Sequence, residues 1–143
     1  MSGKETIPVL GDGSERGTVM ESILVSIKKM LGIEECYGHF DADIIMHINS
    51  VLSILTQIGV GPPGGFYIQS ADEKWTDFLP DMSKLDMIKS YVYLKVRLLF
   101  DPPSSSAAME SYNRMISEFE WRIHVATDPV ETKSEEGTTN ETE

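Results

Sequence analysis

Apolar residues recur at three- and four-residue steps through four stretches of the chain, which is the spacing typical of amphipathic helices. The spacing predicts helices over residues 20–31, 41–58 and 83–100. A fourth helix is expected to start after a cap among Ser104–Ser106 and to end at Val125. Each helix has an apolar side that must be covered, and the second has a broad one. The pattern therefore predicts an all-α fold, a compact bundle in which these sides meet.

Glycine and proline mark the ends of the predicted helices. Gly32 follows the first helix and Gly59 the second, as expected of residues that stop a helix. Asp101, Pro102 and Pro103 break the third helix, because proline disfavours the helical conformation in the residue before it. We expect these three residues to set the angle between the last two helices.

A long segment rich in glycine and proline, residues 59–75, separates the second and third helices. Its composition fits neither a helix interior nor a central strand. Within and after it, we expect Phe66–Gln69 to be a short extended segment and Trp75–Leu79 to form one short turn. Loops of this length in helical domains tend to be either functional or mobile.

The third helix is apolar around nearly its whole circumference. A helix with this pattern is enclosed by neighbours, which lie either in the core of a bundle or in adjacent subunits. The sequence leaves both arrangements open.

The fourth helix has an apolar stripe and a charged side formed by Glu110, Arg114, Glu118 and Arg122. Their i,i+4 spacing predicts ion pairs that each stabilise the helix by about 0.3 kcal/mol. Trp121 departs from the apolar stripe and projects among these charges. Either the helix is frayed or bent by that point, or Trp121 anchors a protein contact, as exposed tryptophans in interfaces do.

Charge is distributed unevenly along the 143 residues, which carry a net charge of −11. Residues 1–19 carry −1, residues 20–126 carry −5 and residues 127–143 carry −5. The last segment has no large apolar side chains beyond its start, and we expect this acidic tail to be disordered when free. The first segment is expected to be a flexible arm or an extension upstream of an alternative start at Met20. The folded domain is therefore predicted to span residues 20–126.

Composition excludes several classes of protein. A pI near 4.6 argues against a protein that grips nucleic acid by neutralising phosphates. No stretch approaches the roughly 18 apolar residues that a membrane span requires, and the start lacks the pattern of a secretory signal. The single Cys36 cannot form an intrachain disulfide and fits a reducing compartment. We expect a soluble, intracellular, globular protein.

Catalytic and metal-binding patterns do not stand out in the sequence. Cys36 and His39 are spaced like half of a zinc site, but neither His47 nor His124 supplies a second half at matching spacing. The glycines of residues 59–65 follow a helix rather than a strand and do not match a phosphate-binding loop. We predict that the chain is not an enzyme and needs no cofactor or metal.

A longer pattern connects the helical blocks. Residues 91–103 read Tyr-Val-Tyr-Leu-Lys-Val-Arg-Leu-Leu-Phe-Asp-Pro-Pro, and Trp121 follows in Glu-Trp-Arg. Upstream lie Ser-Ile-Lys-Lys-Met-Leu-Gly-Ile and Phe-Asp-Ala-Asp-Ile-Ile-Met-His-Ile-Asn-Ser. The order of these blocks around the Phe-Asp-Pro-Pro break resembles the head–tail connector (adaptor) proteins of long-tailed phages, which are often labelled DNA-packaging proteins in prophages. The resemblance covers residues 20–125.

The resemblance implies a structural virion protein of the phage neck, assembled in the host cytoplasm. It implies a ring of about twelve copies beneath the portal protein. Such a ring prolongs the DNA channel and docks the stopper or tail-completion protein. DNA is then cargo that passes through the channel, and an acidic surface suits this passage because like charges do not adhere. No membrane is implied.

The resemblance and the helix faces together assign residues to subunit or portal contacts. For the third-helix residues the alternative is simple burial or solvated charge. Loop 59–75 or the tail 127–143 is expected to become ordered on contact with the portal or the next neck protein. The assigned residues are Tyr91, Lys95, Arg97, Arg114, Glu118, Trp121 and Arg122.

A second hypothesis remains open from the residues alone. A small acidic helical regulatory or protein-interaction module, of the anti-repressor or DNA-mimic type, would have the same composition. The position of the gene separates the two, because a connector gene follows the capsid genes whereas a regulator lies near repressor genes.

Overall fold

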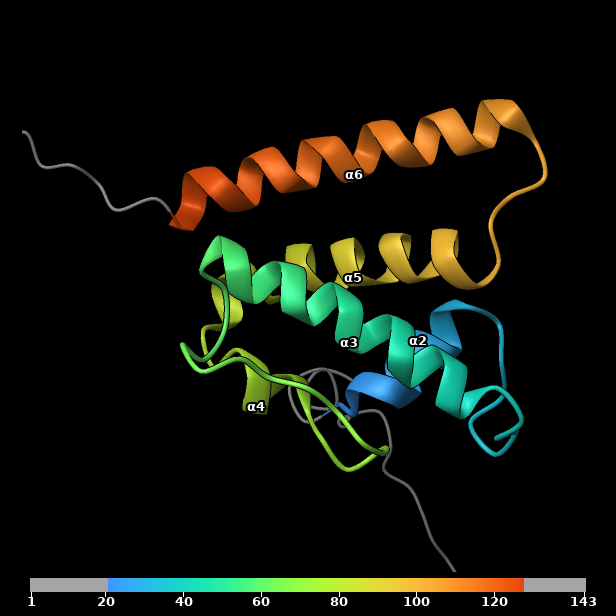
Figure 1. The fold of residues 1–143 in the computed structure, drawn as a ribbon, viewed down its shortest axis with the longest axis horizontal. Helices are drawn as coiled ribbons and strands as arrows, with labels where there is room; N and C mark the ends of the chain where they lie inside the picture. The colour runs from blue at the N-terminus through green and yellow to red at the C-terminus, as the bar shows by residue number, and fades with distance from the viewer. Residues whose placement is uncertain (1–20, 128–143) are drawn as a thin grey trace, which may run out of the picture.

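A central helix with other helices packed around it forms the core of the computed structural model, which describes residues 21–127 (Figure 1). Within this range the fold is all-α, as predicted, and an isolated antiparallel bridge joins Ser22 to Lys74. The expected extended segment at Phe66–Gln69 forms no strand. In chain order, the elements are α2 (Ile23–Met30), α3 (Asp41–Ile58), α4 (Trp75–Phe78), the 3-10 turn η1 (Met82–Lys84), α5 (Leu85–Phe100) and α6 (Ser106–Thr127). Our expectations for residues 1–19 and for the tail 127–143 lie outside the described range except at Thr127, which is the last residue of α6 and not part of a disordered tail.

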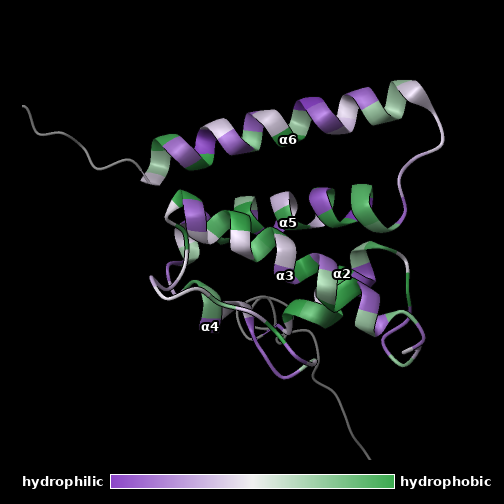
Figure 2. Cartoon of the chain, in the orientation of Figure 1, coloured by the Kyte–Doolittle hydropathy of each residue, from purple (hydrophilic) through white to green (hydrophobic). Residues whose placement is uncertain are grey.

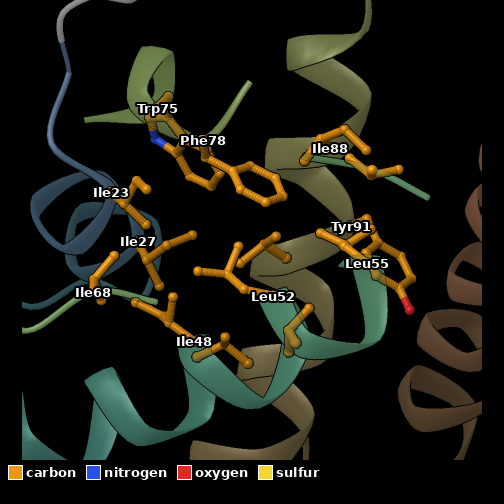
Figure 3. Packing of buried hydrophobic residues seen from close by; sticks show 14 of the residues in the cluster. Ile23, Ile27, Ile48, Leu52, Leu55, Ile68, Trp75, Phe78, Ile88 and Tyr91 are labelled. Carbon is orange, nitrogen blue, oxygen red and sulfur yellow. The ribbon is translucent and has the colours of Figure 1, made fainter. Parts of the chain in front are cut away.

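The central helix is α5, which packs against α3 on one side and α6 on another (Figure 1). Side chains from α2, α3, α4 and α5 meet in one apolar cluster (Figure 3). The apolar circumference of the third predicted helix is therefore covered largely by elements of the same chain. Figure 2 shows that α6 is more polar along its length than α3. The largest apolar side chains in the cluster are Trp75, Tyr91, Phe78, Ile23, Ile27, Ile44, Ile48, Leu52, Leu55, Ile68 and Leu85.

The first helix starts at Ile23, later than the predicted residue 20, because Ser22 caps it. The Ser22 hydroxyl accepts a hydrogen bond from the backbone N–H of Val25 at 3.2 Å. An N-cap residue has extended backbone, so the helix begins immediately after it. At the other end, Gly32 adopts a φ of +83°, which is the left-handed conformation that favours glycine.

A buried lysine ties α2 to the connector that precedes α3. Lys28 is only 1% exposed, and its Nζ donates hydrogen bonds to the carbonyl oxygens of Glu35 and Tyr37, at 3.0 and 2.8 Å. The same Nζ lies 2.8 Å from the Asp41 carboxylate, in the first turn of α3. A buried ammonium is tolerated when its charge is paired and its donors are used. Lys28 therefore fixes the position of α3 relative to α2.

Loop 59–75 is anchored to the core by hydrogen bonds. The Asn49 side chain donates to the Ile68 carbonyl at 2.9 Å and accepts from the Ile68 N–H at 2.7 Å. The Glu73 carboxylate accepts from the backbone N–H groups of Gln69 and Ser70. Because the chain itself holds the loop, the expectation that this loop becomes ordered only on contact with a partner is wrong. The parallel expectation for the tail falls on residues outside the described range.

The short helix α4 confirms the predicted turn after this loop, and its two aromatic residues lie inside the core. Trp75 is fully buried and its Nε1 donates to the Ser26 hydroxyl at 2.7 Å. Nearby, the buried Lys89 pairs with Glu21 at 2.8 Å and lies 6.0 Å from the centre of the Trp75 ring. Helices α2, α4 and α5 are thus joined by polar contacts as well as by apolar packing.

The predicted break after α5 is present, and the chain reverses direction there to place α6 alongside α5 (Figure 1). Arg97 Nε donates to the backbone carbonyl of Asp101 at 2.6 Å, which holds the first residue of the break against the end of α5. Helix α6 starts at Ser106. The hydroxyl of the preceding residue, Ser105, accepts a hydrogen bond from the Ala108 N–H at 3.2 Å.

Candidate contact surfaces

Helix α6 exposes most of its circumference. Of its 22 residues, only Ile116 and Ile123 are buried. Trp121 is 67% exposed and Val125, one turn later, is 55% exposed. The helix continues beyond Trp121 to Thr127, so fraying does not explain why this residue lies off the apolar stripe. An exposed tryptophan on a regular helix is typical of a contact surface.

Charged residues surround Trp121 on the outer side of α6 and pair with one another. The guanidinium Nη2 of Arg122 lies 2.6 Å from the carboxylate Oε1 of Glu118, and Nη2 of Arg114 lies 3.8 Å from Oε1 of Glu110. All four side chains are more than half exposed, so each pair stabilises the helix by a few tenths of a kcal/mol, about 0.3. We call this surface the α6 ridge, and it consists of Glu110, Arg114, Glu118, Trp121, Arg122 and Val125.

Tyr91, which we expected at a subunit contact, is enclosed within the chain. It is fully buried, and its hydroxyl donates to the Glu120 carboxylate of α6 at 2.8 Å. Figure 3 shows this hydroxyl pointing out of the core cluster toward α6. Burial, the hydrogen bond to Glu120 and the negative charge of that group together raise the pKa of Tyr91. The structure therefore shows the burial that we gave as the alternative, and Tyr91 joins α5 to α6.

The other two assigned residues of α5 remain partly accessible. Lys95 Nζ lies 4.0 Å from the same Glu120 carboxylate, and its side chain is 27% exposed. The Arg97 side chain is folded against Asp101, at the end of its own helix. Tyr91, Lys95 and Glu120 thus form one polar contact between α5 and α6, with Lys95 at its accessible edge.

Beyond its first turn, where Asp43 is exposed, the outer side of α3 has no charged side chain. Between Ile44 and Ile58 the chain contains no Asp, Glu, Lys or Arg, and Met46 is 57% exposed. Three hollows lie on this side: the middle one shares Asn49 and Ser53 with the second and Ser50 with the third. We call this surface the α3 face, and it consists of Ala42, Ile45, Met46, Asn49, Ser50, Ser53 and Gln57.

Sequence reasoning missed the α3 face because it followed apolar positions and not charge. Exposed helix sides normally carry Lys and Glu, and the centres of protein interfaces are depleted of charged residues. The charge-free run of α3 was therefore a usable signal. At its edges, the α3 face meets Tyr67 of loop 59–75, which is 63% exposed, and Leu99 of α5, which is 52% exposed.

An aromatic cluster at the start of α3 was also not anticipated. His39 and Phe40 lie edge to face with ring centres 4.8 Å apart, and Phe40 meets Phe100 of α5 at 5.3 Å. His47 extends the cluster and lies 6.4 Å from Phe100. The two histidines thus pack against phenylalanine rings. Over residues 21–127, no three His, Cys, Asp or Glu side chains lie together as a metal site requires.

The fold and its exposed features define the class of the protein: a small helical subunit whose distinctive surfaces suit contact with other proteins. The model of the phage connector protein family matches residues 23–130, and the chain belongs to this family. Comparisons with curated proteins and with solved structures found no match. The family membership confirms the resemblance, and it gives the chain a head–tail connector role in the phage particle.

Membership of this family also bears on three further expectations. Phage connectors are structural rather than enzymatic and interact with other virion proteins, and the family points to the neck of the virion. Separately, the described part of the chain contains no helix that is both long and apolar enough to cross a membrane.

Proposed function

We propose that the chain is an adaptor subunit that forms a ring of about twelve copies beneath the portal. The ring extends the DNA channel and docks the stopper or tail-completion protein, and the subunit is assembled in the host cytoplasm. The observation that carries the proposal is the α6 ridge, where Trp121 is 67% exposed on a helix of which only Ile116 and Ile123 are buried. Family membership supports the location of the ring in the neck.

Contact residues in this proposal come from two helices. Trp121, Arg114, Glu118 and Arg122 contact a neighbouring subunit or the portal from the α6 ridge, where Arg can pair with carboxylates in a bidentate way. Lys95 contributes from the accessible edge of α5. Tyr91 is left out of the contact set because its side chain is buried, and Arg97 acts at the end of its own helix.

The acidic charge of the chain supports passage of DNA through the channel. A net charge of −11 removes the gain that a basic surface obtains when counterions leave DNA. DNA therefore slides past the ring without adhering to it. In this proposal DNA remains cargo, and the protein partners are the portal and the stopper or tail-completion protein.

The acidic tail is proposed to strengthen binding to the portal. Deletion of residues 128–143 leaves Thr127 in place, whose hydroxyl contacts the Ile58 carbonyl at 3.3 Å, so α6 keeps its last contact with α3. We expect the truncated chain to fold normally and to bind the portal more weakly. Portal binding equal to that of the full chain would remove the tail from the proposal.

Light scattering over a wide concentration range, with negative-stain images of the same fractions, tests the ring. The full chain is measured alone and together with the portal protein of the same genome. A closed ring in either sample supports the proposal. A chain that stays monomeric in both samples contradicts it and favours the regulatory or protein-interaction module.

A further inference from the structure

Two surfaces of this acidic chain carry no net charge. The α3 face has no charged side chain, and the two glutamates of the α6 ridge are balanced by its two arginines. Acidic surfaces of identical copies repel each other, so copies of this chain can approach most closely where charge is balanced. Exposed acidic residues lie in the connector before α3, in loop 59–75, in α4 and in α5, at Glu34, Glu35, Asp72, Asp77 and Asp86. Asp43, in the first turn of α3, lies beside the α3 face and is not part of it.

We propose that neighbouring copies of the chain meet through these two surfaces, with the α6 ridge of one copy against the α3 face of the next. This inference rests on the proposed ring and names the two parts of the subunit that form its repeated contact. The α3 face and the α6 ridge have no residue in common, as is required if one copy is to use both surfaces at once.

The apolar parts of the two surfaces complement each other. Trp121 and Val125 stand one turn apart on the α6 ridge and form a single apolar projection. At the edge of the α3 face, a hollow between α3 and α5 can receive it, because its walls are mostly apolar and Leu99 is half-exposed there. A tryptophan that enters such a hollow buries a large apolar area. The hollow is lined by His47, Ser50, Val51, Ile54, Lys95, Leu98 and Leu99.

The charge at the rim of this hollow favours the α6 ridge of a neighbouring copy as its occupant over another apolar segment. Among the residues that line the hollow, Lys95 alone carries a full charge, and it is positive. On the α6 ridge, Glu118 lies one turn before Trp121. When Trp121 of one copy enters the hollow of the next, this carboxylate is placed to approach Lys95 of that copy. The pairing fixes the direction of α6 across the neighbouring α3 face.

Contact between two different surfaces has a consequence for assembly. When each copy uses the same surface, assembly stops at a dimer. When copies join head to tail through two different surfaces, more copies can be added until the assembly closes into a ring. The pairing of the α6 ridge with the α3 face is of the second kind, as a ring requires.

Chemical cross-linking distinguishes these two kinds of contact. Two full-length variants are made in a Cys36→Ser background, because the native thiol is exposed. One carries Ser50→Cys on the α3 face, and the other carries Val125→Cys on the α6 ridge. With a short thiol-specific cross-linker, we expect linked dimers in the mixture and little product from either variant alone. As a control, the mixing experiment is repeated with Glu34→Cys in place of Val125→Cys. The thiol of this variant lies in the connector, outside both surfaces.

A charge placed on the α3 face provides an independent test. Ser53→Glu is expected to weaken self-association by about tenfold or more, since it places a carboxylate in the middle of the α3 face. Ser104→Glu makes the same change at an exposed serine outside both surfaces and is expected to leave association unchanged. Circular dichroism on both variants establishes that each is folded.

The outcomes separate this inference from the proposed function. If the full chain assembles, alone or with the portal, but Ser53→Glu also assembles normally or either cysteine variant links efficiently to itself, the pairing is wrong and the ring stands. If the full chain assembles in neither sample, the ring and the pairing both fail. Linking confined to the mixed sample, together with loss of assembly in Ser53→Glu, supports the pairing.

Discussion

The two longest helices, α3 and α6, differ in how the rest of the chain holds them. Five of the 18 residues of α3 are buried, and the helix is tied to α2 through Lys28 and to loop 59–75 through Asn49. Of the 22 residues of α6, two are buried, and the helix rests mainly on α5. The comparison shows that α3 builds the domain, while most of the surface of α6 is available to other molecules.

The largest expected difference concerns the buried apolar residues of the two helices. Leu52→Ala in α3 removes a fully buried side chain from the centre of the core and is expected to lower the free energy of unfolding by about 3–4 kcal/mol. Ile116→Ala in α6 is expected to cost about 2 kcal/mol, because its surroundings are closer to solvent. Urea unfolding of both variants measures the two values. Equal losses would contradict the view that α6 contributes less to the core.

A smaller effect is expected where α6 is attached to α5. Tyr91→Phe removes the hydroxyl that donates to Glu120 and is expected to lower the free energy of unfolding by about 1 kcal/mol. Hydrogen exchange is expected to become faster in α6 and to stay unchanged in α3. Faster exchange throughout the domain would show that α6 does not open separately.

The same variant gives a pH dependence whose sign follows from the raised pKa of Tyr91. The protonated phenol is favoured in the folded state, so its contribution to stability is complete below the ordinary tyrosine pKa of about 10. It is lost as the pH rises from there toward the folded-state value. The stability difference between the wild-type chain and Tyr91→Phe should therefore shrink above about pH 10. A constant difference would contradict the buried hydrogen bond.

The smallest effect on stability is expected at the most exposed large side chain. Trp121→Ala is expected to change the free energy of unfolding by less than about 0.5 kcal/mol, because the ring is in solvent in the single chain. Thermal unfolding measures this value. Tyr37→Ala, at a half-exposed ring away from the α6 ridge, is the matched control. A large loss of stability in Trp121→Ala alone would show that this residue supports the fold.

Local sequence signals predicted the helices well and long-range contacts poorly. The predicted bounds of the second helix, 41–58, agree with α3, because Gly59 and the apolar period both act within a few residues. The outward position of Trp121 followed from the same period. By contrast, the anchoring of loop 59–75 depends on Asn49 meeting Ile68, 19 residues away. No local pattern specifies such a pair, so the sequence did not show that the chain itself holds the loop.

The positions of some candidate contact residues, but not of all, followed from the sequence. Arg114, Glu118 and Arg122 could be placed around Trp121 from helical spacing alone, and the structure records the pair between Glu118 and Arg122. Tyr91 was assigned to the outside because the helix pattern does not distinguish a neighbour in the same chain from one in another. Its contact with Glu120 spans 29 residues and required the structure.

The contacts of Lys28 bear on the order in which the domain folds. Its two carbonyl partners lie 7 and 9 residues along the chain, so little entropy is lost when these loops close. The contact between Thr127 and Ile58 closes a loop of 69 residues, which is costlier before other contacts exist. We therefore expect the segment from α2 to the start of α3 to condense early during refolding and the end of α6 to dock late. A newly made subunit would then have its α3 face in place before its α6 ridge.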